Sequence, residues 1–258
     1  MKRYAIENKQ DAISYDIAQK LRKELDKIMI YDKTSPELVI SVGGDGTVLY
    51  CVHKYQNQLD KVAFIGIHTG TLGFITDYQK DEYIKLVEDI KEGEYDIYNR
   101  NLLAITTNKD SYIALNELRI ENNMRSQVLD VYINDELLET FRGNGLCVST
   151  SSGSTAYNKS LGGAVIYSDI GIMQLSEIAG IHHNAYRSLG SSLILDLSHV
   201  IHFESQNFEN SVLGIDHLVY DMKDVKYVDV RLSPTQARFI QFKHVSLIER
   251  LKRAFLSV

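Results

Sequence analysis

Residues 38–47 read Leu-Val-Ile-Ser-Val-Gly-Gly-Asp-Gly-Thr, and this segment sets the expectation for the fold. Its first half is an apolar, β-branched run typical of a buried strand. Its second half surrounds one carboxylate, Asp45, with glycines, which let backbone N–H groups approach an anion closely. Because residues 48–55 predict a helix, whose start also favours negative charge, we interpret residues 43–47 as a phosphate-binding loop. A tight turn in which Asp45 caps the helix is the alternative.

Strand and helix patterns alternate through the rest of the N-terminal part. Short apolar runs at residues 4–6 and 62–67 predict strands. From Asp11, apolar residues recur at helical spacing and predict an amphipathic helix, and residues 81–91 follow the same pattern. Alternation of this kind favours a layered α/β unit built on a parallel sheet.

Closely spaced strands dominate after Gly93. We predict them at residues 102–107, 112–121, 128–133, 137–141, 146–149, 192–197, 200–204, 211–215, 226–232 and 237–242. Helices are expected over residues 154–161 and, more weakly, over 173–178, and an amphipathic helix closes the chain from His244. The sequence therefore predicts an α/β N-terminal domain over residues 1–98, a β-rich C-terminal domain over 99–243 and a closing helix over 244–258.

Composition narrows the class of protein. The chain has 258 residues, of which 28 are basic and 34 acidic, giving a formal net charge of −6. Nucleic-acid-binding domains usually carry a basic stripe, and no apolar run approaches the ~20 residues of a transmembrane helix. Cys51 and Cys147 are the only cysteines, too few for a disulfide framework. We therefore expect a cytoplasmic protein that binds neither nucleic acid nor membrane.

Three further polar motifs are candidates for ligand binding. His68-Thr-Gly-Thr-Leu-Gly-Phe74 follows a predicted strand, where α/β sheets place their ligands, but a plain loop explains it equally well. Residues 149–157 read Ser-Thr-Ser-Ser-Gly-Ser-Thr-Ala-Tyr, whose hydroxyls suit phosphate or ribose, with a capped serine-rich loop as the alternative. Asn116-Glu117 offers polar groups to a base or sugar, or else forms a turn on an exposed strand.

Together these motifs resemble one family. The Gly43–Thr47 loop is similar to the signature of the NAD kinase, diacylglycerol kinase and phosphofructokinase superfamily. Asn116-Glu117 and the residues 153–157, in this order, narrow the resemblance to NAD kinases. Asp216-His217 and the closing helix look like the Gram-positive bacterial type, and the resemblance covers nearly the whole chain. It implies an α/β domain followed by a β-rich domain, with the last helix packing back on the first.

The resemblance also implies a reaction and its residues. An NAD kinase transfers the terminal phosphoryl group of ATP, or of polyphosphate, to the 2′-hydroxyl of the adenosine ribose of NAD, giving NADP. Mg²⁺ would be bound through the nucleotide phosphates, with no protein metal site. By resemblance Asp45 is the general base, and Gly43, Gly44 and Thr47 form the phosphate loop. The implied substrate-binding residues are Gly46, Phe74, Asn116, Glu117, Arg142, Asn144, Ser152, Thr155, Ala156, Tyr157, Asn158, Lys159, Ser160, Tyr186 and His217.

The chain departs from the family pattern at two positions. Asn144 stands where family members typically have aspartate, and we expect this change to weaken dinucleotide binding by ~1–2 kcal/mol. Ser151 stands where the family usually has proline, which makes the loop less preorganised. The resemblance further implies a homotetramer, built as a dimer of dimers, in which Arg142 is a candidate to reach a neighbouring pocket.

Three other functions remain open at this stage. A lipid kinase with the same glycine loop would need an apolar or basic membrane-facing patch, which the sequence does not show. A silent dinucleotide sensor would bind NAD or NADP without turnover, and Asn144 makes this the more interesting rival. An assembly subunit with purely structural loops is the third.

Overall fold

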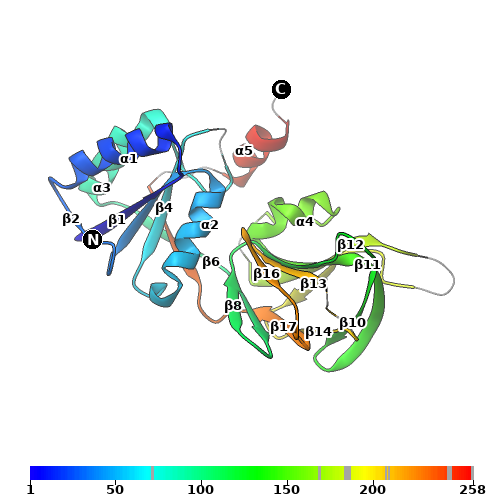
Figure 1. Ribbon diagram of the computed structural model, residues 1–258. Helices are drawn as coiled ribbons and strands as arrows, with labels where there is room; N and C mark the ends of the chain where they lie inside the picture. The colour runs from blue at the N-terminus through cyan, green and yellow to red at the C-terminus, as the bar shows by residue number, and fades with distance from the viewer. Residues whose placement is uncertain are drawn as a thin grey trace. The chain divides into compact units, whose positions relative to one another are not determined.

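The computed structural model describes residues 1–70, 73–167, 170–182, 187–206, 208, 210–242 and 246–256. The chain divides into two compact units, residues 1–100 with 235–258 and residues 101–234 (Figure 1). The second unit ends at residue 234, whereas the sequence predicted that the β-rich domain would end at residue 243. Strand β18 (Ala237–Gln241) accounts for this difference, because it pairs with strands of the first unit rather than the second.

The first unit is built on a mostly parallel sheet. Its order is β2-β1-β3-β4-β18-β6, with β5 beside β4, and only β6 is antiparallel to its neighbour. The strands are β1 (Arg3–Asn8), β2 (Ile30–Tyr31), β3 (Leu38–Gly43), β4 (Ala63–His68), β5 (Tyr78–Gln79) and β6 (Asp96–Arg100). Every residue of β3 and β4 is buried, as expected of central parallel strands covered on both faces.

Helices cover both faces of this sheet (Figure 1). They are α1 (Ala12–Leu25), α2 (Asp45–Lys54) and α3 (Tyr83–Glu92), with short 3₁₀ turns η1 (Gln56–Gln58) and η2 (Lys80–Glu82). The first and third pack together against side chains such as Tyr4 and Ile40, while α2 lies on the opposite face. Asp11 fixes the start of α1 by accepting the Ser14 N–H at 2.8 Å, and the predicted helix is confirmed.

The closing helix is short and contacts the rest of the first unit through a buried arginine and an aromatic side chain. It consists of α5 (Leu247–Leu251) and a π-helical turn, η4 (Lys252–Leu256). Arg250 is buried, donates to the carbonyls of Phe74 and Thr76 at 3.0 and 3.1 Å, and pairs with Asp77. On the apolar side of this helix, Ile248 is 50% exposed, whereas the Phe255 ring lies 5.2 Å from that of Phe74, centroid to centroid. The buried arginine and the aromatic contact of Phe255 therefore tie the helix to its neighbours.

The second unit is an eleven-stranded antiparallel sheet that curls on itself. Its order is β16-β15-β9-β11-β10-β14-β17-β7-β8, with β12 paired to β11 and β13 to β12. The strands are β7 (Leu103–Thr107), β8 (Ser111–Ala114), β9 (Glu117–Glu121), β10 (Gln127–Ile133), β11 (Glu136–Thr150), β12 (Ile172–Gly180), β13 (Leu193–Asp196), β14 (Ile201–Glu204), β15 (Val212–Ile215), β16 (Leu218–Asp221) and β17 (Tyr227–Leu232). A single apolar cluster of buried residues, including Phe141 and Phe203, fills its interior.

Several sequence predictions for this unit were wrong. The weak helix over residues 173–178 is part of strand β12, which pairs along β11. The two strands over 137–141 and 146–149 form one long strand, and the single strand over 112–121 breaks into β8 and β9. The helix over 154–161 is a 3₁₀ turn, η3 (Ser152–Thr155), followed by one turn of α4 (Tyr157–Ser160). No helix in the described residues is long and apolar enough to cross a bilayer.

Candidate active site

The glycine loop of the first unit joins a strand to a helix, as predicted. Strand β3 ends at Gly43 and α2 begins at Asp45, with Gly44 as its N-cap. Glycine has no side chain to cap the helix, and no side chain caps α2. The Thr47 N–H donates to the Gly44 carbonyl at 2.9 Å, and the N–H groups of Asp45 and Gly46, without a partner among the described residues, can bind an anion.

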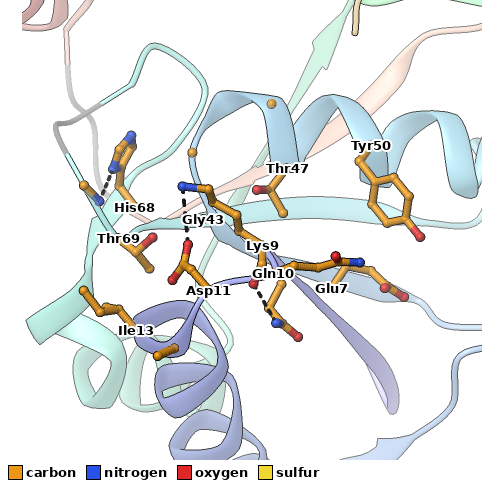
Figure 2. A pocket seen from close by; sticks show the side chains of 15 residues that line it. Glu7, Lys9, Gln10, Asp11, Ile13, Gly43, Thr47, Tyr50, His68 and Thr69 are labelled. Carbon is orange, nitrogen blue, oxygen red and sulfur yellow. Dashed lines mark hydrogen bonds and ion pairs between the residues drawn. The ribbon is translucent and has the colours of Figure 1, made fainter. Parts of the chain in front are cut away.

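A hollow of about 1050 Å³ opens at this loop. It lies at the carboxyl ends of β1, β3 and β4 and is lined by residues 7–13, Gly43, Gly44, Gly46, Thr47, Tyr50 and residues 68–70. Figure 2 shows Thr47 and Tyr50 reaching it from α2, with Ile13 approaching from α1. The predicted phosphate-loop residues thus line one cavity, at the sheet edge where parallel α/β folds bind ligands.

Asp45 does not line this hollow, because its carboxylate turns toward the second glycine-rich segment. One oxygen accepts the Phe74 N–H at 2.8 Å and the other accepts the Ile75 N–H at 3.1 Å. A Cβ on Gly73 would lie 2.1 Å from the Asp45 Oδ1 atom, so only glycine permits this approach. The two N–H donors fix the direction of the carboxylate, and each oxygen retains a lone pair for a further proton or hydrogen bond.

Phe74 connects this arrangement to the closing helix. Its side chain is half-buried, and its ring lies 5.2 Å from that of Phe255, centroid to centroid. Its backbone both donates to Asp45 and accepts from Arg250. The backbone of Phe74 therefore links Asp45, the candidate base, to the C-terminal helix, independently of the contact that its ring makes.

Charged side chains that the sequence analysis did not single out also line the hollow. The Lys9 ammonium lies 3.4 Å from the Asp11 carboxylate, as Figure 2 shows. Glu7 is buried and accepts from the Lys54 ammonium at 2.6 Å and the Tyr55 hydroxyl at 3.0 Å. The sequence could have indicated these residues, because they directly follow the strand predicted at residues 4–6. The glycine loop follows its own strand in the same way.

In the second unit, three separate sequence motifs meet around one buried carboxylate. Asp216 accepts the N–H groups of Leu115, Asn116 and Glu117 at 2.8, 2.8 and 3.2 Å. The Asn116 carbonyl in turn accepts the Thr150 N–H at 2.9 Å, at the start of the serine-rich loop. The structure therefore brings together Asn116-Glu117, the serine-rich loop and Asp216-His217, which lie far apart in sequence.

The side chains of this cluster retain unused polar atoms. Oδ1 of Asn116 and Oε2 of Glu117 are buried and have no hydrogen-bond partner among the described residues. Burial, followed by the negative charge of Asp216, raises the pKa of Glu117 to about 7. Buried polar atoms normally find partners, so these two are ready to bind the polar groups of a ligand.

Comparison with known proteins identifies the family of this chain. The family model of the ATP-NAD kinase N-terminal domain matches residues 2–95, and that of the ATP-NAD kinase C-terminal domain matches residues 115–242. The chain belongs to the NAD kinase family. An NAD kinase of Geobacillus stearothermophilus is 40% identical over 98% of this chain and 96% of its own length. NAD kinase 1 of Bacillus subtilis is 41% identical over 98% of both chains.

Solved structures show the same fold. Yeast NADH kinase complexed with NADH has a TM-score of 0.87 at 18% identity, covering 100% of this chain and 89% of the other. An NAD kinase from Archaeoglobus fulgidus in complex with ATP has a TM-score of 0.74 at 21% identity, covering 97% and 95%. The predicted family and its fold class, an α/β N-terminal domain with a β-rich C-terminal domain, are confirmed.

Tyr157, which the NAD kinase resemblance places in the dinucleotide pocket, is held on two sides. Its hydroxyl donates to Glu121 at 3.1 Å, and the Arg119 guanidinium lies 4.9 Å from its ring centre. Arg119 and Glu121 also form an ion pair at 3.2 Å. These two neighbours were not singled out from the sequence. They fix the plane of the ring that we expect to face a base.

The rest of the serine-rich loop divides by burial. Ser152, Thr155 and Ala156 are partly exposed, and Lys159 and Ser160 are exposed. The Asn158 side chain is fully buried and accepts the Ser176 hydroxyl at 2.7 Å. Its position beneath the loop favours a supporting role over direct contact with a ligand.

Asn144 and Ser151, the two residues that depart from the NAD kinase pattern, each form a hydrogen bond with a nearby backbone carbonyl. Asn144 donates through Nδ2 to the Asn122 carbonyl at 2.9 Å, a bond that the aspartate of other family members cannot make. Ser151 has a φ of −55°, which suits proline, and its hydroxyl donates to the Ile170 carbonyl. This hydrogen bond offsets part of the rigidity that proline would give.

Three of the implied substrate-binding residues remain to be placed: Arg142, His217 and Tyr186. Arg142 is partly buried in β11, and its carbonyl accepts the Ile181 N–H at 2.8 Å. His217 is exposed and follows Asp216, whose backbone is left-handed with a φ of 50°. Tyr186 lies outside the described residues.

Proposed function

We infer that this protein catalyses the ATP-dependent phosphorylation of NAD to NADP. The observation that carries this conclusion is the match to NAD kinases over both domains, at about two-fifths identity across nearly the whole chain. The chemistry of the site supports it, since one carboxylate stands beside a glycine loop that can hold phosphates. Phosphoryl transfer depends mainly on positioning and charge stabilisation, which such a site provides.

The proposed reaction uses Asp45 as the general base. The bond between the terminal phosphorus of ATP and the ADP oxygen breaks, and a new bond forms to the 2′-oxygen of the adenosine ribose of NAD. The proton of that hydroxyl passes to the Asp45 carboxylate, and ADP leaves. The N–H groups of Phe74 and Ile75 fix the direction of this carboxylate, as a base requires.

We place the ATP triphosphate in the hollow of the first unit. The N–H groups at the start of α2, the glycine loop and the Lys9 ammonium all favour an anion there. A divalent metal accompanies ATP in this reaction, and we propose that it is Mg²⁺. The Asp11 carboxylate and the Thr47 hydroxyl offer the oxygen donors that Mg²⁺ prefers, so the lining fits a metal carried mainly by the phosphates. When bound, it would neutralise charge on the phosphate oxygens.

We place the dinucleotide at the cluster of the second unit. The unpartnered oxygens of Asn116 and Glu117 suit the amino group of adenine and the hydroxyls of ribose. The fixed ring of Tyr157 offers a flat surface for a base. The neighbouring residues Ser152, Thr155 and Ala156 would line the same pocket.

Further properties follow from the family resemblance and are part of the proposal. We propose a cytoplasmic homotetramer, a dimer of dimers in which Arg142 reaches the pocket of a neighbouring subunit, and polyphosphate as a second donor. Light scattering coupled to size exclusion tests the tetramer, and replacement of ATP by polyphosphate tests the donor. A monomer with full activity would refute the shared pocket.

The reaction itself is tested by incubating the protein with NAD, ATP and Mg²⁺ and measuring NADP with an NADP-specific dehydrogenase. Parallel calorimetric titrations measure the binding of NAD and NADP. We expect NADP to accumulate until one substrate is consumed. Tight binding of NAD with no NADP formed would instead identify a silent sensor, the alternative that the amide at Asn144 suggests.

A further inference from the structure

His68 lies at the edge of the hollow. One nitrogen of its ring accepts a backbone hydrogen bond, and the other lies near the glycine loop. His68 ends strand β4 and is only 8% exposed. Its Nδ1 atom accepts the Gly70 N–H at 2.9 Å. A ring nitrogen that accepts a hydrogen bond carries no proton, so the neutral ring has its proton on Nε2. The contact with Gly70 therefore makes Nε2 a hydrogen-bond donor.

The surroundings of His68 favour this neutral form. Burial lowers its pKa below the ordinary value of 6.5, and the charge of Asp45 acts in the opposite direction. Protonation of Nδ1 would also set two donors, Nδ1–H and the Gly70 N–H, against each other. The ring is therefore neutral at neutral pH and presents one donor, Nε2–H.

This donor faces the start of α2. A Cβ on Gly44, the N-cap of that helix, would lie 3.7 Å from Nε2 of His68. Both residues line the hollow, and Figure 2 shows the His68 ring beside it with its bond to the Gly70 N–H. Among the described residues, Gly70 is the one hydrogen-bond partner of this ring. The ring is 8% exposed, and its Nε2–H, which has no partner among the described residues, lies beside the uncapped start of α2.

Three positive features thus line the hollow. They are the Nε2–H group of His68, the free N–H groups at the start of α2, and the Lys9 ammonium. No carboxylate among the described residues accepts from His68, so a ligand in the hollow can accept its Nε2–H. An anion with several oxygens, such as a nucleoside triphosphate, satisfies all three.

We propose that His68 binds the triphosphate of ATP by donating its Nε2–H to a phosphate oxygen at the start of α2. The inference rests on the proposed function, and it assigns a residue that contacts the phosphoryl donor rather than NAD. A neutral donor in a preorganised position stabilises charge on a phosphate oxygen without the reorganisation that water would need.

Two substitutions separate this role from a structural one. His68→Asn keeps an acceptor at the Nδ1 position for Gly70 but removes the Nε2 donor. His68→Gln keeps a donor near the Nε2 position but loses the acceptor. We expect His68→Asn to lower kcat/KM for ATP by about 10- to 100-fold, and His68→Gln to retain about tenfold more activity than His68→Asn. KM for NAD should be unchanged in both, and His53→Asn, late in α2 and outside the hollow, should match the unaltered protein.

The opposite order of activity, with His68→Asn near normal and His68→Gln impaired, would show that the ring only holds the loop at Gly70. Because the variants can also lose stability, ¹⁵N NMR of the unaltered protein supplies a second readout. We expect an Nδ1-unprotonated, Nε2-protonated ring whose Nε2 resonance moves when AMP-PNP and Mg²⁺ are added. An Nε2 resonance that does not respond would overturn the inference. An unaltered protein that makes no NADP but shows this response would refute the proposed function and leave the triphosphate contact standing.

Discussion

Asp216 holds three backbone N–H groups in the second unit, and its replacement by asparagine has a predictable cost. Asp216 is 6% exposed and accepts three backbone N–H groups, from Leu115, Asn116 and Glu117. In Asp216→Asn one oxygen becomes an NH₂ group, which leaves at least one of these buried donors without an acceptor. That costs about 1–3 kcal/mol, and the loss of charge on the remaining bonds costs about 1 kcal/mol each. Relief of the repulsion with Glu117 offsets part of this, so we expect a net loss of about 3 kcal/mol.

The assay is urea unfolding followed by circular dichroism, combined with hydrogen exchange at residues 115–117. Asp216→Asn should lower the free energy of unfolding by that amount and speed exchange of these amides by about 100-fold. Asp224→Asn is the matched control, because Asp224 is also left-handed, with a φ of 61° against 50° for Asp216, but exposed. It should change stability by less than about 0.5 kcal/mol. If both variants unfold alike, the carboxylate does not organise this cluster and the reasoning fails.

Three further outcomes are expected. The folded pKa of Glu117, about 7 against an ordinary 4.5, means that the folded state binds the proton more tightly, so stability falls as pH rises from about 4.5 to 7. The decline reaches about 3 kcal/mol in urea unfolding, Glu117→Gln should remove it, and an unchanged slope would contradict the assignment. Gly73→Ala should lower kcat by about 100-fold, because its Cβ would displace the Asp45 carboxylate, and a normal steady-state kcat would show that Asp45 tolerates movement. Asn144→Asp should cost about 1 kcal/mol of stability through the lost bond to Asn122, yet bind NAD about tenfold more tightly by calorimetry; no gain in affinity would refute the explanation of this departure.

The first unit was largely predictable because its elements carry strong local signals. Strand β3 is apolar apart from Ser41 because both its faces are covered, and α1 shows a clear helical period with Asp11 as its cap. The glycine loop between β3 and α2 was located for the same reason. The hollow was only partly predicted, because Glu7 and Lys9 are common residue types whose place in a site shows only when the strand ends are seen together.

The second unit was less predictable because pairing across the sheet overrides local preference. Residues 173–178 read Met-Gln-Leu-Ser-Glu-Ile, several of which favour helices, yet they form β12 because they pair along β11. The carboxylate of Asp216 meets Asn116 across about a hundred residues of sequence, which no local pattern reveals. The resemblance to NAD kinases identified both motifs without indicating that one holds the other.

The replacement Asp45→Asn tests the central claim most directly. Asparagine keeps the shape and can still accept a backbone N–H, but it cannot take a proton from the ribose hydroxyl. The account predicts that kcat for NADP formation falls by about 100-fold or more, while the Kd of NAD changes by less than about threefold. A variant that keeps its kcat would contradict the assignment of Asp45 as the base. A variant that loses NAD binding instead would show that the carboxylate holds the substrate rather than accepting its proton.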